Sequence, residues 1–333
     1  MKKQKKSKFD VYTSSYVKGE KMNDEELLNV KSQILDIFGE LEENNLSEIE
    51  KWITSHAYKK DLEKKKKLQK FEKKLVKISK VLREIVPFEA EMQTENIVPP
   101  TVGDQADCTK INTCHVDEFL YDDKEVDELV QKGKLSRFYC VECNSRNCKE
   151  LIFISHSMST QMLQYIFNVL LPKDLENKQI LDVGSRLGAV LYGAYYFSNV
   201  STIIGVEMNK ECCDIQETII KKFAMDTNRI KIVHSDIMKR SDIVQCSNIV
   251  VINVLDFFVD IEKHKEMWYF FKKNIKCGSY LITNRSMVDT LTSLGIFEDM
   301  LDWLTICKCS QFENEIYFDI EDYKDLHVYI VNK

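Results

Sequence analysis

The sequence predicts an α/β fold in which a mainly parallel sheet carries helices on both faces. Three observations in the second half of the chain predict it. A glycine-containing turn, 184–188, follows the apolar run Ile180–Val183 and leads into a helical pattern. Further apolar runs alternate with helical patterns, and acidic residues follow the ends of several runs. Strands that alternate with helices are typical of βαβ units and parallel sheets.

The turn after the first apolar run has the features of a ligand-binding turn. Asp182 lies two residues before Gly184, and Gly188 precedes the helical pattern at 189–197. Glycines let the backbone approach a ligand closely, and the N–H groups at a helix N-terminus attract anionic groups. In nucleotide-cofactor folds such a turn marks the first strand and the crevice at the carboxyl end of the sheet.

The remaining runs continue this pattern to the C-terminus. Their continuous apolar character is typical of strands covered on both faces, and they lie at 202–206, 230–233, 248–254, 279–283 and 326–331. The helical patterns lie at 189–197, 209–225, 262–275 and 295–302. Glu207 follows the second run and Asp236 follows the third. Residues 304–331 predict two closing strands joined by a polar loop, 313–325.

On these residues, the segment from about Ser155 to the C-terminus resembles the class I S-adenosylmethionine (SAM)-dependent methyltransferases. The resemblance implies a Rossmann-like seven-stranded methyltransferase sheet with SAM as its cofactor. In that family the glycine turn binds the methionine end of SAM, the acid after the second strand binds the ribose, and the residue after the third meets the adenine. The implied cofactor-binding residues are Asp182, Gly184, Ser185, Arg186, Gly188, Glu207, Met208, Asp236, Ile237 and Asn253.

The turn departs from the family pattern at Arg186, where the family has a glycine. Three interpretations stay open. The side chain crowds the cofactor, donates a two-pronged hydrogen bond to the cofactor's carboxylate, or points to solvent. A dinucleotide-binding oxidoreductase is the runner-up within this fold, but its Gly-x-Gly-x-x-Gly turn is missing. A catalytically inactive methyltransferase-fold scaffold or interaction protein is the alternative to an enzyme.

The residues after the fourth run are the candidates for catalysis. Asn253 and Asp256 lie where they can orient an amine or a hydroxyl, and the alternative is that Asp256 caps the next helix. Many nucleic-acid amino methyltransferases carry two prolines here, and their absence speaks against adenine or cytosine as acceptor. The Ser/Thr-rich stretch before a helix at 159–171 is similar to that of non-SET histone lysine methyltransferases, and we favour a protein side chain as acceptor. We interpret His156, in this stretch, as a structural histidine.

The chain divides into four predicted parts. These are a basic tail (1–22), a helical hairpin or coiled-coil-like region (23–87), a linker and cysteine-rich module (88–154), and the methyltransferase domain (155–333). The helical region has an apolar stripe opposite a lysine face, formed by Leu68, Phe71, Leu75, Ile78, Leu82 and Ile85. We expect the region to dock on the rest of the chain or on a partner protein. We also expect a chain that starts near residue 100 to keep its SAM site.

The cysteine-rich module contains a candidate structural zinc site. Cys140 and Cys143 have the Cys-x-x-Cys spacing of a zinc knuckle. A second pair of ligands would come from Cys108, Cys114, His115 and Cys148. The alternative is a small hairpin, 139–147, whose thiols bind no metal.

Composition limits the class of protein. The 333 residues are 44% hydrophobic and 30% charged, which is typical of a globular protein. A signal-peptide pattern and an apolar run of membrane-spanning length are both missing, and eleven cysteines without such a signal favour the reducing cytoplasm or nucleus. The net charge is −6, although residues 59–83 hold twelve Lys or Arg against three acids. This basic stretch leaves the rest of the chain acidic, so nucleic acid is a disfavoured partner. A membrane is not expected as a partner.

Overall fold

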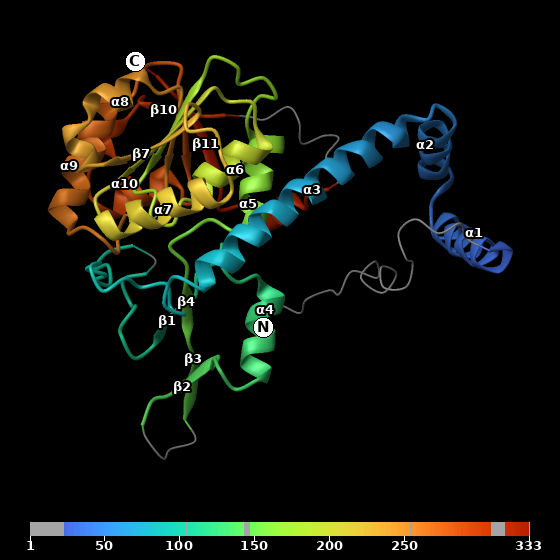
Figure 1. The fold of residues 1–333 in the computed structure, drawn as a ribbon, viewed down its shortest axis with the longest axis horizontal. Helices are drawn as coiled ribbons and strands as arrows, with labels where there is room; N and C mark the ends of the chain where they lie inside the picture. The colour runs from blue at the N-terminus through green and yellow to red at the C-terminus, as the bar shows by residue number, and fades with distance from the viewer. Residues whose placement is uncertain (1–22, 104, 143–146, 254, 308–316, 333) are drawn as a thin grey trace. The chain divides into compact units, whose positions relative to one another are not determined.

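The computed structural model describes residues 23–103, 105–142, 147–253, 255–307 and 317–332 (Figure 1). The chain forms two compact units, residues 1–64 and 65–333. The first unit contains α1 (Asp24–Gly39), α2 (Glu43–Thr54) and the start of α3 (Ala57–Arg83). Neither α1 nor α2 has a buried residue. The helical pattern over residues 47–86 predicts one continuous helix, but the chain turns at His56, whose φ of 60° is left-handed, and this separates α2 from α3.

Helix α3 contributes its apolar stripe to the core of the second unit. Leu68, Leu75, Ile78 and Leu82 are buried, whereas Ile85 is 45% exposed. The three buried residues nearest the helix end belong to the same core cluster as the glycine-turn helix. A chain starting near residue 100 would lack these side chains, which leaves a hole in the core and lowers its stability. That such a chain keeps its SAM site stays a prediction.

The second unit is built on a seven-stranded mixed sheet. The strands lie in the order β10-β11-β9-β8-β5-β6-β7, with β11 antiparallel to both of its neighbours and the other pairs parallel. The antiparallel closing pair predicted from residues 304–331 is thereby confirmed. The strands are β5 (Gln179–Val183), β6 (Thr202–Glu207), β7 (Ile230–His234), β8 (Ile249–Ile252), β9 (Tyr280–Thr283), β10 (Leu304–Ile306) and β11 (His327–Val331).

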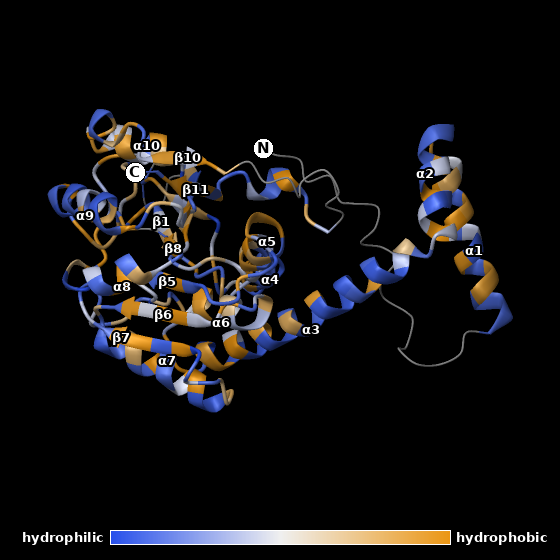
Figure 2. Cartoon of the chain, turned by 90° about the horizontal axis from the view of Figure 1, so that it is seen from above, coloured by the Kyte–Doolittle hydropathy of each residue, from blue (hydrophilic) through white to orange (hydrophobic). Residues whose placement is uncertain are grey.

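Helices cover both faces of this sheet, which explains why its strands are apolar throughout. Along β5, Ile180 joins the core under one set of helices and Leu181 joins the core under the other. Figure 2 shows these apolar residues gathered in the strands and on the inner sides of the helices. One face carries α5 (Thr160–Tyr165), its π-helical continuation (Ile166–Leu170), α6 (Ala189–Phe197) and α7 (Lys210–Lys222). The other carries α8 (Ser241–Cys246), α9 (Ile261–Asn274) and α10 (Met287–Ser293).

One predicted helix is wrong. Residues 295–302 contain only a 3₁₀ turn, Glu298–Met300, and the helix in this region is α10, which ends before Gly295. Gly295 has a φ of 70°, which stops the preceding helix in the manner of a glycine C-cap. Part of the polar loop predicted at 313–325 lies outside the described residues.

In the sequence, the segment between α3 and α5 forms two small sheets and one helix. Strands β1 (Thr113–His115) and β4 (Ile152–Ile154) pair in parallel, and β2 (Phe138–Cys140) pairs with β3 (Cys148–Glu150) so that Cys140 faces Cys148. Helix α4 (Asp123–Gln131) begins with a capping box from Asp122. Cys143 lies outside the described residues, and within them no group of three or more His, Cys, Asp or Glu side chains is placed to hold a metal. The described helices include none that is long and apolar enough to cross a membrane.

The packing under the glycine turn predicts the effect of a single methyl group. In Gly205→Ala, the new Cβ on β6 would lie 2.6 Å from Ser185 Oγ and 2.7 Å from Leu191 Cδ1. We expect the free energy of unfolding to fall by about 1–3 kcal/mol, because a packed core does not accept the added volume. Gly39→Ala on α1, where nothing lies within 4 Å of the added Cβ, is the control and should leave the melting of the second unit unchanged. Equal melting of both variants in calorimetry would contradict this packing.

Candidate functional site

A pocket of about 610 Å³ opens at the carboxyl ends of the parallel strands. It lies where the strand order reverses, between β5 and β8, which is the usual ligand position in open α/β sheets. Its volume falls within the range of small-molecule sites, roughly 300–1,000 Å³. We call it the strand-end pocket. It is lined by Thr94, Glu95, Asn96, His156, Val183, Gly184, Arg186, Val206, Glu207, Met208, Asn209, Lys210, Glu211, His234, Ser235, Asp236, Ile237, Asn253, Leu255, Phe258, Val259, Lys263 and Met267.

The glycine turn between β5 and α6 forms one wall. Gly184 and Gly188 have φ values of 69° and 85°, which glycine adopts without strain. Gln216 on α7 fixes the turn from below, because its amide accepts a hydrogen bond from Ser185 Oγ (2.9 Å) and donates one to the Arg186 carbonyl (2.8 Å). Ser185 and Gly188 therefore shape the turn without lining the pocket.

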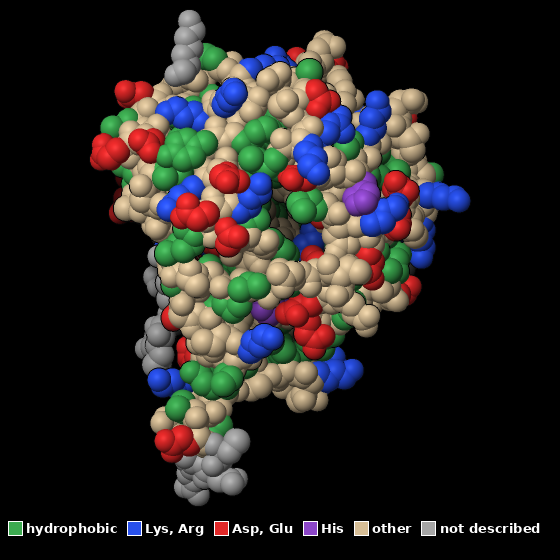
Figure 3. All heavy atoms as spheres, turned by 90° about the vertical axis from the view of Figure 1, so that its left-hand side faces the viewer, with side chains coloured by type: hydrophobic (Ala, Val, Ile, Leu, Met, Phe, Trp, Pro, Cys, Tyr) green, Lys and Arg blue, Asp and Glu red, His purple; other side chains and the backbone are tan. Residues whose placement is uncertain are grey.

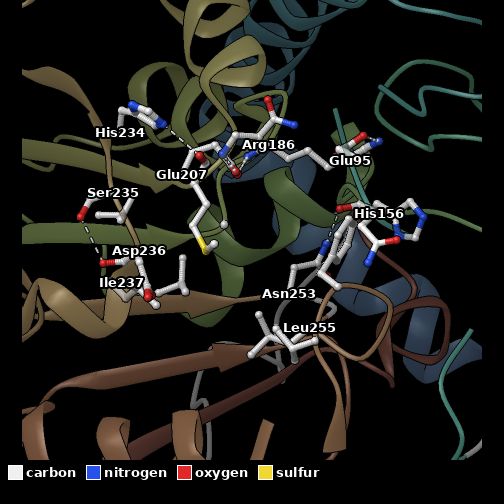
Figure 4. A pocket seen from close by; sticks show the side chains of 18 of the residues that line it. Glu95, His156, Arg186, Glu207, His234, Ser235, Asp236, Ile237, Asn253 and Leu255 are labelled. Carbon is white, nitrogen blue, oxygen red and sulfur yellow. Dashed lines mark hydrogen bonds and ion pairs between the residues drawn. The ribbon is translucent and has the colours of Figure 1, made fainter. Parts of the chain in front are cut away.

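The interpretation that the Arg186 side chain points to solvent is wrong, and crowding of the cofactor stays a prediction. Its side chain is buried and extends toward Glu95 of the strap, by which we mean residues 89–103 (Figure 4). The guanidinium donates to both Glu95 oxygens, at 2.7 and 2.9 Å, and also to the Ala90 carbonyl. Asp117 approaches from the other side, at 3.3 Å. Two donors of the Arg186 guanidinium are thus bound by a carboxylate of the protein itself, and not left free for a cofactor carboxylate.

Two buried carboxyl groups near the glycine turn, Asp117 and Asp182, have raised pKa values. Burial raises the pKa of Asp117, although Arg186 and the Ser157 hydroxyl counteract it. Burial, with the charge of Glu207 nearby, raises the pKa of Asp182 to about 8. Asp182 is buried in β5 and does not line the pocket. Such perturbed carboxyl groups beside a cavity are typical of functional sites.

Glu207, at the end of β6, lines the pocket as an acid without a cationic partner. Its two oxygens accept backbone N–H groups, one from Asn209 (2.7 Å) and one from Arg186 (2.8 Å). Burial raises the pKa of Glu207, and those N–H groups lower it. No Lys or Arg side chain of the described residues pairs with it. Each oxygen keeps a lone pair for a donor in the pocket.

The end of β7 supplies the opposite wall. Asp236 accepts the Met238 N–H at 2.9 Å and so caps the short 3₁₀ helix Ile237–Lys239. Figure 4 shows Ser235 and Asp236 across the pocket from Glu95 and His156. Seven of the ten implied cofactor-binding residues line this pocket, namely Gly184, Arg186, Glu207, Met208, Asp236, Ile237 and Asn253.

The structure separates the two candidate catalytic residues. Asn253 lines the strand-end pocket and donates from Nδ2 to the His156 carbonyl at 3.0 Å. Asp256 instead pairs with Arg285 and lines an adjacent cavity of about 680 Å³, which we call the second cavity. The capping interpretation of Asp256 is wrong, because Asp260 caps α9. The two cavities share Asn96, Phe258, Val259 and Lys263.

Sequence reasoning missed the residues that enter the site from the first half of the chain. Glu95, Asp117 and His115 lie about 70 to 90 residues before the glycine turn, and no spacing rule connects them to it. The only local signal was the extended, proline-containing composition of the strap. Gln216 reads in the sequence as a surface position of a helix, yet it is fully buried.

Similarity to known proteins was found among solved structures, each with a TM-score below 0.5. No family model matches the chain, and no curated protein does. Among solved structures, an O-methyltransferase from Bacillus cereus in complex with SAH matches with 13% identity and a TM-score of 0.38, over 54% of this chain and 84% of that one. Precorrin-6y C5,15-methyltransferase from Geobacter metallireducens shares 15% identity over 53% of this chain and 88% of its own, with a TM-score of 0.35. An RNA methyltransferase from Salinibacter ruber, in complex with S-adenosyl-L-homocysteine, shares 12% identity over 37% of this chain and 71% of its own, with a TM-score of 0.29. Arguments about function therefore rest on the pocket itself.

The raised pKa of Asp182 predicts a dependence of stability on pH. The native carboxyl, with a pKa of about 8, holds its proton where an unfolded Asp, at roughly 3.9, has lost it. This contribution to stability is complete below pH 4 and is lost as the pH rises through about 8. We expect Asp182→Asn, which is neutral at every pH, to flatten the decline by up to about 1.4 kcal/mol per pH unit. Urea unfolding between pH 5 and 8 measures this, and an unchanged slope would contradict a protonated Asp182. Asp117 and Glu118, whose pKa values burial also raises, should keep part of the slope in the variant.

The buried pair between Arg186 and Glu95 predicts a large coupling. Arg186→Ala should lower the free energy of unfolding by about 3–5 kcal/mol, because it leaves the buried Glu95 and Asp117 without their cation. Glu95→Ala should lower it by less, because Asp117 still pairs with Arg186. The double variant should lose much less than the sum. The exposed pair Arg137 and Asp127 is the matched control, for which a cycle should give less than about 1 kcal/mol. Additive losses at Arg186 and Glu95 would contradict the pairing.

Proposed function

We propose that this protein binds SAM in the strand-end pocket and transfers its methyl group to an acceptor. The observation that carries the proposal is the state of Glu207, a buried carboxylate that faces the pocket, is fixed by backbone N–H groups and lacks a cationic partner among the described residues. A ribose diol offers two O–H donors, which one carboxylate accepts together.

The neighbouring elements fit the rest of this cofactor. Gly184 leaves the turn open on the pocket side, since a Cβ built there meets nothing within 4 Å. Asp236 supplies an acceptor at the end of the next strand, where the adenine amino group would lie. The positive charge of Arg186 is already matched by Glu95 and Asp117, so Glu207 leaves the pocket with an excess of negative charge. This excess suits a sulfonium cation.

SAM supplies an electrophilic methyl group, so the task of the protein is to align and deprotonate the acceptor. Alignment alone can supply roughly 7–11 kcal/mol of the barrier. Asn253 and His156 lie on the strap side of the pocket, away from Asp236, and Phe258 packs against His156 to complete this wall (Figure 4). We assign this wall to the acceptor.

A non-catalytic scaffold is the second candidate, and one observation favours it. Because Glu95 occupies both prongs of the Arg186 guanidinium, that side chain is not available to a ligand carboxylate. A protein that uses this pair only to hold the strap against the turn would bind SAM weakly or not at all.

A protein acceptor or partner fits the surface better than nucleic acid does. Basic and acidic side chains are interspersed around the hollow on the face in Figure 3, and this face has no continuous basic surface. In α1, Leu28 and Leu35 are 64% and 68% exposed. We propose that this first unit binds a partner protein, since exposed apolar side chains on one helix are typical of such contacts.

The proposal predicts the result of calorimetry with SAM and S-adenosylhomocysteine. Both should bind, and Glu207→Ala should weaken binding by roughly 1.5–3 kcal/mol, the contribution of a charge-assisted hydrogen bond. Glu217→Ala, on the exposed side of α7, is the matched control. Circular dichroism must first show that the variant is folded, because Glu207 also fixes two backbone N–H groups.

Two results would contradict the proposal. Failure of the wild-type protein to bind either ligand would favour the scaffold, and binding of NAD in place of SAM would favour an oxidoreductase. Unchanged SAM affinity in folded Glu207→Ala would remove the ribose assignment.

A further inference from the structure

Two histidines lie against each other at the acceptor wall. The parallel pairing of β1 with β4 sets His115 opposite Ile154, two residues before His156. The imidazoles stack with centroids 5.0 Å apart, and His115 Nδ1 lies 2.9 Å from His156 Nε2. On its other side, His115 Nε2 lies 3.5 Å from Glu91 Oε1 of the strap, and the Glu91 side chain is 45% exposed. The three side chains form a continuous line from the pocket wall to solvent.

Two buried polar atoms at this wall have no hydrogen-bond partner among the described residues. They are His156 Nδ1 and Asn253 Oδ1. The hydrogen bond from Asn253 Nδ2 to the His156 carbonyl fixes which end of the amide is the oxygen. Buried polar groups are nearly always satisfied, so two neighbouring exceptions call for a ligand that satisfies them.

The surroundings keep both histidines neutral. Burial, together with the charge of Arg186 and the neighbouring His115, lowers the pKa of His156 to about 2. Burial and Arg186 also lower the pKa of His115, whereas Glu91 raises it. The negative Glu91 favours a proton on His115 Nε2. His115 Nδ1 is then an acceptor, His156 Nε2 is the donor to it, and His156 Nδ1 carries a free lone pair.

The second cavity lies beside this wall. Phe258 lines both cavities, and its ring packs edge-on against His156 with centroids 5.0 Å apart. The second cavity has apolar walls from Val98, Pro99, Pro100, Val102, Val259 and Ile261, with Asp260 and Glu262 at the start of α9. An aliphatic stem fits such walls.

We propose that the second cavity admits an aliphatic primary amine, and that Asn253 and His156 hold its amino group as the methyl acceptor while Glu91, His115 and His156 relay its proton to solvent. This proposal rests on the proposed SAM-dependent function. Two acceptors match the two N–H bonds of a neutral amine and leave its lone pair directed at the methyl group. A hydroxyl, with one hydrogen, would leave one acceptor unsatisfied. The amine enters by displacing the half-buried Phe258 ring, which covers His156.

The step balances as follows. The amine lone pair forms the N–C bond, and the C–S bond breaks with its electron pair going to sulfur. The nitrogen loses one proton to His156 Nδ1, His156 Nε2 passes its proton to His115 Nδ1, and His115 Nε2 passes its proton to Glu91. Glu91 then releases a proton to water. When product leaves, water in the pocket accepts the proton on His156 Nδ1. A proton from solvent then passes from Glu91 through His115 to His156 Nε2, which restores the starting tautomers.

The tautomer is measured without any acceptor. In full-length protein labelled with ¹⁵N-histidine, long-range ¹H–¹⁵N correlation should show His156 protonated at Nε2 and unprotonated at Nδ1, and His115 protonated at Nε2. Addition of n-butylamine to the protein loaded with S-adenosylhomocysteine should shift His156 Nδ1, and n-butanol should shift it less. A proton on Nδ1 would overturn the relay. No shift up to 50 mM amine, or an equal shift with both compounds, would overturn the amine assignment.

Methyl transfer is the second measurement. Isotope from methyl-labelled SAM, incubated with cell extract, should appear as N-methylated amine: in lysine of the protein fraction if the acceptor is a protein, or in free amines if it is a small molecule. His156→Gln should lower the rate about 10²–10⁴-fold. Glu91→Gln should lower it less and make it rise with pH, because hydroxide must then remove the proton. His327→Gln and Glu150→Gln, both remote from the pocket, are matched controls.

The outcomes separate this inference from the proposed function. If the wild-type protein does not bind SAM, the proposed function is wrong, whichever tautomers the two histidines adopt. The second outcome is normal SAM binding in the wild type and in folded His156→Gln. If the label then appears in O-methyl or S-methyl groups, or if His156→Gln leaves the rate of methyl transfer unchanged, the relay is wrong and the proposed function stands.

Discussion

The structure depends on the ion pair between Arg186 and Glu95. Arg186 stands in a turn position with a φ of 42°, where a glycine would be unstrained and a side chain costs conformational energy. The buried guanidinium offsets this cost through Glu95, Asp117 and the Ala90 carbonyl, all of which belong to the chain before the sheet. The side chain that breaks the glycine pattern is therefore the one that joins the first half of the chain to the glycine turn.

This pair makes the strap part of the site. Glu95 lines the strand-end pocket because Arg186 holds it there, and Glu91 reaches His115 from the same segment. Asp117 extends the network, since it accepts a hydrogen bond from the Ser157 hydroxyl at 2.6 Å, next to His156. The charge of Arg186 lowers the pKa of both histidines. A single arginine thus positions the strap and adds to burial in lowering the pKa values of the two imidazoles.

The sequence predicted the features that depend on local pattern. The strand Ile180–Val183, the helix at 189–197 and the antiparallel closing pair follow from apolar periodicity and glycine placement, and the structure has all three. It did not predict the break at His56, because no glycine or proline marks it. It also could not predict that Glu95 and Asp117 meet Arg186, because long-range ion pairs leave no periodic signal. The zinc prediction rests partly on Cys143, outside the described residues, and stays a prediction.

The two sides of the strand-end pocket differ in their charge. Near Arg186 the positive charge is balanced, and burial is the largest influence on the histidine pKa values. At Glu207 no Lys or Arg side chain of the described residues offsets the carboxylate. Burial raises the pKa of Glu207, and the backbone N–H groups of Asn209 and Arg186 counteract this. The acidic side therefore favours a cation, whereas the neutral histidine side favours an uncharged donor of hydrogen bonds. A sulfonium cofactor and a neutral amine need this division, because the methyl group must pass from a cation to a nucleophile that has kept its lone pair.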